Sequence, residues 1–140
     1  MELYFKIPTL ATMVQQITKG IKISVKVKYD GTLYRNHNLY HNFSYYITIE
    51  NKSLETVQLT DRFWKIFDSL NDTEIVEGEG VVGQTPVLEP EDTYKYKSGC
   101  FLSSSMGAMT GHYTMVNMAT QKTFDVTIPT FQLSNAVSLN

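Results

Sequence analysis

The run IKISVKVKY, residues 21–29, decides the fold class of this chain. Apolar residues alternate strictly with lysine or serine, and this period of two is typical of a β-strand with one buried face and one solvated face. The exposed positions carry Lys22, Lys26 and Lys28. Lysines on an outer strand usually solvate it and discourage pairing with another sheet edge. We therefore interpret this row as a solvated surface rather than as an anion-binding patch.

The same alternation recurs along the chain and predicts further strands. These are expected at residues 43–49, 57–67, 75–76, 93–97, 111–118 and 124–129. The strand at 57–67 is expected to bend near Thr60 and Asp61, with Trp64 as its core anchor. Residues 1–19 leave two alternatives open. One is a short helix that begins at Pro8 and Thr9, and the other is an edge strand at 13–18 that follows a loosely held extension, residues 1–12.

The segments between the strands read as turns and loops. Asp30 and Gly31 are expected to open a polar loop that runs to about Leu39, and residues 99–107 form a Ser/Gly-rich connection. Phe131 and Leu133 are expected to hold the C-terminal tail. Seven to eight short strands at this spacing predict an all-β protein, an immunoglobulin/fibronectin type III-like β-sandwich. No linker or repeat argues for a second domain, so one domain is expected over residues 13–140.

Composition narrows the choice of compartment and partner. The chain has 140 residues, a net charge of -2 and a pI of about 5.9, which give no basis for broad binding to nucleic acid or membranes. Cys100 is the one cysteine, so no internal disulfide can form, and a reducing compartment suits it. Lys6 and Pro8 interrupt any secretory or membrane-spanning run at the N-terminus. A cytoplasmic protein is expected.

The glycine segment GEGVVG, residues 78–83, has the spacing of a dinucleotide-binding turn. Such a turn must open a helix, and prolines at positions 86 and 90 prevent one from forming. Glu77 and Glu79 also place negative charge where a phosphate would lie. We expect Gly80 and Gly83 to serve backbone turns or bulges. Nucleotide or pyrophosphate binding stays open as an alternative.

A set of short motifs, in order along residues 13–133, resembles the ApaG family. They are TKGIKISV (18–25), TIEN (48–51), ETVQL (55–59), RFW (62–64), GEGVVG (78–83), PVL (86–88), YxSGC (96–100), GAMxGxYxM (107–115) and IPTFQL (128–133). The combination is specific, although each motif alone is weak. Two departures stand out. Members commonly have Arg-His-Trp where this chain has Phe63 as the middle residue, and Pro-Gly-Glu where it has Pro90-Glu91-Asp92.

The resemblance implies a fibronectin type III-like, free-standing bacterial protein whose family is associated with cobalt and magnesium resistance or efflux. Related eukaryotic domains, attached to an F-box protein and to a polymerase delta-interacting protein, resemble protein-interaction modules. The family's glycine motif has also suggested nucleotide or pyrophosphate binding. No catalytic residue or cofactor carries over to this chain. Any role of the histidine in the family's Arg-His-Trp motif is lost here, because Phe63 stands in its place.

Candidate metal ligands are sparse. His37 and His41 have metal-ligand spacing only on a helix, and their stretch carries no helical signal, so exposed loop histidines are expected. Glu77, Glu79 and Glu89 suit a hard cation but lack a recognisable ligand loop.

No nucleophile carries the surroundings that acyl transfer requires, so a non-enzymatic binding module without a cofactor is expected. Its surface for an unknown protein partner is predicted to comprise Arg62, Phe63, Lys65, Gly78, Gly80, Gly83 and Gln84. On a period-two strand Trp64 and Phe63 point to opposite faces, so Phe63 is either a partly exposed anchor or covered core. Self-association is left open.

Overall fold

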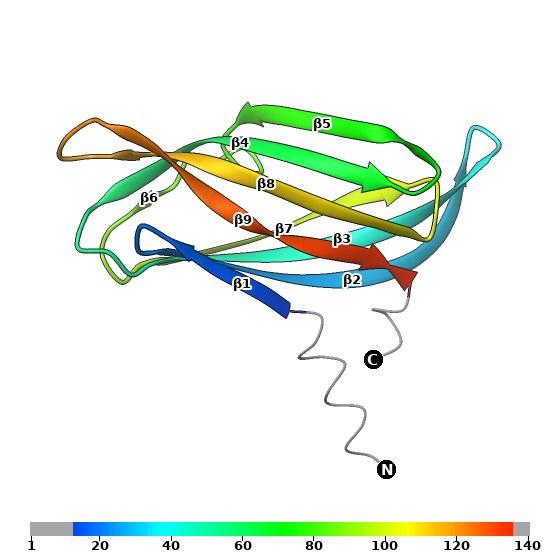
Figure 1. Cartoon of the computed structure of the whole chain (residues 1–140), viewed down its shortest axis with the longest axis horizontal. Helices are drawn as coiled ribbons and strands as arrows, with labels where there is room; N and C mark the ends of the chain where they lie inside the picture. Colours follow the sequence, from blue (N-terminus) through cyan, green and yellow to red (C-terminus); the bar gives the residue numbers. More distant parts are fainter. Residues whose placement is uncertain (1–12, 136–140) are drawn as a thin grey trace, which may run out of the picture.

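The computed structural model describes residues 13–135 and contains only strands and their connections, with no α-helix in that part of the chain (Figure 1). The strands are β1 Met13–Thr18, β2 Ile21–Arg35, β3 Asn38–Asn51, β4 Val57–Asp68, β5 Asn71–Glu79, β6 Val87–Leu88, β7 Thr93–Leu102, β8 Met106–Asn117 and β9 Thr123–Ser134. No helix long and apolar enough to cross a membrane occurs in residues 13–135.

The strands form two antiparallel sheets that pack face to face. One sheet has the order β1-β2-β3-β7, and the other has the order β5-β4-β8-β9 with the short β6 also paired to β4. Contacts of β9 with β1 and β2 close one side of the sandwich. The predicted all-β, immunoglobulin/fibronectin type III-like sandwich is confirmed.

Alternate residues of both sheets fill the space between them. Ile23, Ile49, Leu59, Tyr113, Met115 and Ile128 are fully buried. Trp64 is 3 % exposed, with its ring 5.4 Å from that of Tyr45 and 5.9 Å from that of Phe131. The prediction that Trp64 anchors the core is confirmed. Phe131 and Leu133 are buried too, so the predicted attachment of the tail is confirmed as far as residue 135.

The bend predicted in β4 is a β-bulge. The register of β4 with β8 shifts between Leu59 and Asp61. Before this point the core-facing side chains have odd numbers, as Leu59 does. After it they have even numbers, as Trp64 does. One extra residue at Thr60 is what lets both halves face the core.

Two loop predictions are wrong. No loop begins at Asp30 and Gly31, because β2 and β3 continue to a tight turn at Asn36 and His37. Gly31, with a φ of 98°, lies instead at a register shift, where a bulge absorbs the extra residue. Asn36 and His37 both have positive φ, which matches the two-residue hairpin turns that strands prefer.

The expected connection at 99–107 is also too long, since β7 runs to Leu102 and β8 starts at Met106. For residues 13–18, the edge-strand alternative is confirmed and the helical one is wrong. The predictions for residues 1–12 and for the end of the tail lie outside the described residues.

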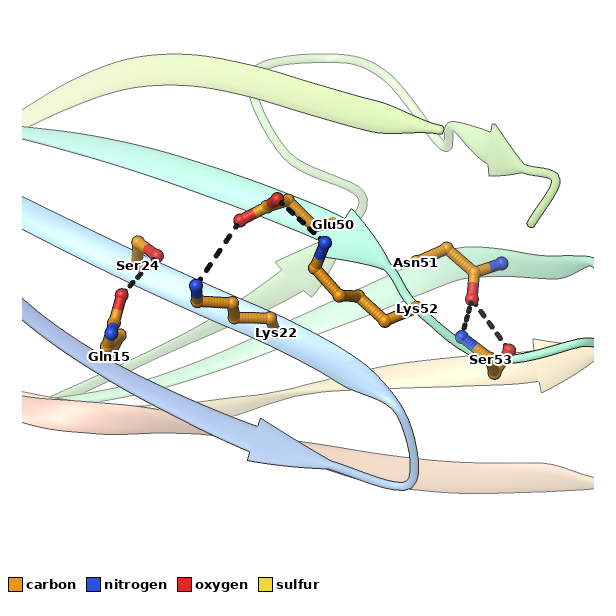
Figure 2. Close-up of polar contacts among 7 residues, drawn as sticks. All are labelled: Gln15, Lys22, Ser24, Glu50, Asn51, Lys52 and Ser53. Carbon is orange, nitrogen blue, oxygen red and sulfur yellow. Dashed lines mark hydrogen bonds and ion pairs between the residues drawn. The ribbon is translucent and has the colours of Figure 1, made fainter. Parts of the chain in front are cut away.

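The segment at the end of β3, residues 51–56, carries the chain from one sheet to the other (Figure 2). The Asn51 side chain is fully buried, and its Oδ1 accepts hydrogen bonds from the Ser53 amide at 2.9 Å and hydroxyl at 2.6 Å. Its Nδ2 donates to the carbonyl oxygens of Glu55 and Leu88 at 2.7 and 2.9 Å. One amide side chain thus fixes the crossover from β3 to β4.

Candidate functional site

The glycine segment forms a tight hairpin at the end of β5. Val81 and Gln84 exchange two backbone hydrogen bonds of 2.8 and 2.9 Å. The two residues that form the turn, Val82 and Gly83, have φ values of 47° and 77°, respectively. The Gly80 amide donates to the Thr60 carbonyl at 2.7 Å, at the bulge in β4. The amides of Gly80, Val81 and Gln84 are therefore already used by backbone carbonyls. We call residues 80–84 the glycine hairpin.

Gly80 also has a steric role. Its φ is +67°, and a Cβ atom there would overlap the carbonyl oxygen of Gln84. Gly83 has a φ of +77°, but a Cβ atom there would meet nothing within 4 Å. These positions agree with the backbone role predicted for both glycines.

Arg62 is clamped against this hairpin. Its Nη1 atom donates to the carbonyl oxygens of Glu79 and Gly80 at 2.9 and 3.0 Å. Gly78 lies opposite Arg62 in the β4–β5 register, and a Cβ atom on Gly78 would come within 3.0 Å of both Nη atoms. The missing side chain of Gly78 thus makes room for the guanidinium group, which holds the hairpin to β4.

A shallow depression of about 600 Å³ lies on the outer face of the five-stranded sheet. Phe63 and His112 line it, with their rings stacked at 5.0 Å and 17°. His112 Nε2 lies 3.9 Å from Asp125 Oδ2. Glu77, opposite Phe63 in the register, closes the β5 side. We call this the Phe63 depression. The Phe63 side chain is half-buried, so it is neither a core residue nor a fully exposed one.

A second, deeper cleft of about 310 Å³ lies between the sheets, where β7 faces β4 and the glycine hairpin. Its polar side chains are those of Tyr45, Arg62, Tyr96, Ser98 and Cys100. Burial raises the pKa of the Cys100 thiol to about 12 and raises the pKa of Tyr96. Both groups therefore stay protonated at neutral pH, and the thiol is a poor nucleophile.

The structure brings together most of the residues predicted for the partner surface. Arg62 and Phe63, with Glu77 and Gly78, line the Phe63 depression. Lys65 lies on the same face of β4 and is exposed. The remaining predicted residues, Gly80, Gly83 and Gln84, belong to the glycine hairpin.

The candidate metal ligands do not converge. Glu89 lies in a separate turn, where its backbone amide donates a hydrogen bond to Asp92 Oδ2 at 2.9 Å. Within residues 13–135, no group of three or more His, Cys, Asp or Glu side chains gathers. His37 is in a turn as expected, but the loop prediction for His41 is wrong. His41 lies in β3 and shares a 2.9 Å hydrogen bond between its Nδ1 and the Tyr29 hydroxyl.

Sequence reasoning missed His112 and Asp125 as parts of this surface. Both come from strands distant in sequence from Phe63. The pairing of β8 with β4 brings His112 beside Phe63, and the pairing of β9 with β8 brings Asp125 near His112. The period-two pattern could place His112 on an outer face, but it carries no signal for which residue lies opposite.

The fold and this site define a β-sandwich protein with an arginine-clamped glycine hairpin at one edge. The family model for the ApaG domain matches residues 32–117. The chain belongs to the ApaG domain family.

Named relatives support this assignment over most of the chain. Protein ApaG of Mesorhizobium japonicum is 44% identical over 122 residues, which cover 86% of this chain and 92% of that protein. Protein ApaG of Brucella anthropi is 41% identical, with the same coverage. A crystal structure of a Bordetella pertussis protein described as ApaA superposes with a TM-score of 0.72 at 32% identity, covering 81% of this chain and 92% of that one. An X-ray structure of a structural genomics target reaches 0.77 at 36% identity, covering 82% and 86%.

Proposed function

We propose that this chain is a non-enzymatic binding module that recognises a protein partner through the Phe63 depression and the adjoining glycine hairpin. The observation that carries the proposal is the half-exposed Phe63 ring, stacked on His112 beside the clamped Arg62. Aromatic residues and arginine are enriched at the centres of protein interfaces. A rigid hairpin next to the ring keeps the ordering cost of binding low.

The charges around the ring indicate the chemistry of the partner. Asp61, Glu77 and Glu79 are exposed around the depression, and no lysine or arginine side chain within residues 13–135 forms a salt bridge with them. Further along the same face, Ile75 and Phe67 are 54% and 42% exposed. A partner surface that offers an apolar side chain flanked by lysine or arginine complements this arrangement.

The chemistry of the interior supports a binding role over a catalytic one. The Cys100 thiol has a raised pKa, and the Tyr96 hydroxyl is hydrogen-bonded to that of Tyr113. Neither is paired with a base that could activate it. A free cysteine also suits the reducing cytoplasm, where we propose that the protein acts.

The two alternatives have less support. A pyrophosphate cradle needs free amides, and those of Gly80, Val81 and Gln84 already bond to carbonyl oxygens. A direct cation site needs converging ligands, and none gather in the described part of the chain. We therefore propose that the family's association with cobalt and magnesium resistance acts through the protein partner.

Affinity capture from native cytosol tests the proposal. Phe63→Asp and Glu77→Lys should each abolish capture of the partner while the melting temperature stays within a few degrees. Leu54→Asp is the matched control, because Leu54 is 92% exposed and lies away from the depression. Undiminished capture by a folded Phe63→Asp protein and by Glu77→Lys would refute the proposal. Glu77 is exposed, so its variant keeps the test valid even if Phe63→Asp does not fold.

A further inference from the structure

The outer face of the four-stranded sheet gathers lysines from two strands that are distant in sequence. Lys26 of β2 and Lys97 of β7 lie on either side of Tyr46 of β3, because both pair with it in the sheet register. Lys28 and Lys95 lie on the same face, two residues along their strands. We call these four lysines and Tyr46 the basic face.

Edge protection accounts for only part of the basic face, because Lys95 and Lys97 lie on β7, an edge strand of the sheet. The sequence suggested that the β2 lysines guard an outer strand, but β2 pairs with β1 on one side and β3 on the other. Lys26, opposite Met13 of β1, is therefore in the interior of its sheet. Protection of a sheet edge therefore does not explain Lys26.

The positive charge of the basic face has no carboxylate partner within residues 13–135. Glu50, an acidic residue on the same sheet face, lies 4.0 Å from Lys22 Nζ and 3.6 Å from Lys52 Nζ at one end of it (Figure 2). Asp30, near the other end, accepts a hydrogen bond from the Ser44 hydroxyl. Lys26, Lys28, Lys95 and Lys97 are all exposed and are free to meet a ligand. The net charge of -2 conceals this local surplus of cations.

Two exposed aromatic rings lie on the same face, each beside a cation. Lys97 Nζ lies 5.6 Å from the centre of the Tyr46 ring, which is 37% exposed. Arg35 Cζ lies 5.4 Å from the centre of the Phe101 ring, which is 46% exposed. Phe101 pairs with Asn42 and Lys97 with Tyr46, so the rings are four residues apart along the strands, or about 13 Å.

From this arrangement we propose that the basic face binds single-stranded nucleic acid. Lysines contact the phosphates, and unpaired bases stack on Tyr46 and Phe101, which is how sequence-tolerant single-strand binders work. An acidic protein would satisfy the lysines but would leave the rings unused. A duplex would reach the lysines with its phosphates, but its stacked bases could not reach the rings. DNA and RNA strands share the chemistry that this face recognises.

Fluorescence anisotropy with labelled oligomers of about 15 deoxythymidines or uridines tests the proposal, since single-strand sites span about 4–16 nucleotides per domain. Saturable binding is expected in low salt, and it should weaken steeply as salt rises. Tyr46→Ala should weaken it about 5- to 150-fold, the loss expected for one stacked base. Lys26→Glu combined with Lys97→Glu should weaken it further and should make the salt dependence shallower by about 0.7 per lost phosphate contact.

Lys122→Glu combined with Lys19→Glu is the matched control, because it makes the same charge change outside the basic face. The control should bind as the parent protein does, and a duplex of the same length should bind more weakly than the single strand. Absence of saturable binding in low salt, or an equal loss in the control, would overturn the proposal. Equal affinity for the duplex would overturn it too. Displacement of the oligomer by polyglutamate at the same charge concentration would also overturn it, because that result would indicate an acidic protein partner.

Discussion

Replacing Gly80 with alanine tests the backbone geometry on which the glycine hairpin depends. Gly80 has a φ of +67°, and an added Cβ atom would overlap the Gln84 carbonyl oxygen, which accepts a hydrogen bond from the Val81 amide. The left-handed backbone alone costs an alanine about 1–2 kcal/mol. Displacing the carbonyl weakens two hydrogen bonds that contribute about 1 kcal/mol each. We therefore expect Gly80→Ala to lower the free energy of unfolding by about 3 kcal/mol.

Gly83→Ala is the internal comparison, because Gly83 has a similar φ of +77° but open space where a Cβ would lie. Only the conformational cost applies there, so a loss of about 1 kcal/mol is expected. Urea unfolding with linear extrapolation measures both values. In a thermal scan the losses correspond to about 12 and 4 °C for a domain of this size. Equal losses for the two variants would refute the steric argument, as would a larger loss at Gly83.

Two further predictions concern the same edge of the sandwich. Val82 is 62% exposed and has a φ of 47°, a conformation that strains a β-branched residue. Val82→Asn should therefore raise the free energy of unfolding by about 1 kcal/mol. An unchanged or lower value in urea unfolding would contradict this. Burial raises the pKa of the Cys100 thiol from 9.0 to about 12, so between these values the unfolded chain loses a proton that the folded chain keeps. The contribution of this thiol to stability should therefore be constant below about pH 9 and be lost as the pH rises towards 12, so Cys100→Ala should show a smaller fall in that range. Identical pH profiles for the two proteins would exclude a contribution from this thiol.

Local patterns predicted the strands and a bend in β4 near Thr60 and Asp61, and the structure shows that this bend is a bulge at which the apolar positions change parity between Leu59 and Trp64. They could not distinguish a turn from a bulge at Asp30 and Gly31. A glycine with positive φ serves both, and the choice depends on whether the chain beyond it pairs again. Here Leu33 pairs with Tyr40, so the hairpin continues, and this contact has no local signature.

The candidate site shows the same limit. The outward position of Phe63 follows from the inward position of Trp64, so sequence alone indicated it. The stacking partner His112 depends on the register of β8, and the arginine clamp depends on the close approach of Gly78. The sequence pattern predicts that the lysines of β2 solvate an outer strand, and it leaves open whether residues 13–18 form a strand beside it. Because β1 pairs with β2 as far as Lys26, protection of a sheet edge does not explain that lysine.

The two proposed surfaces lie on opposite outer faces of the sandwich, and this arrangement follows from the alternation within its strands. Each strand gives one face to the core and one to water, so the basic face on β2, β3 and β7 cannot share residues with the Phe63 depression on β4, β5 and β8. Stacked sheets are about 10 Å apart, and the side chains on the two outer faces point away from each other, so their charges are separated by more than this distance. Lysines on one face and carboxylates on the other therefore influence each other weakly. A ligand on either face should leave the affinity of the other nearly unchanged, which would allow one small domain to hold a protein and a nucleic acid strand together.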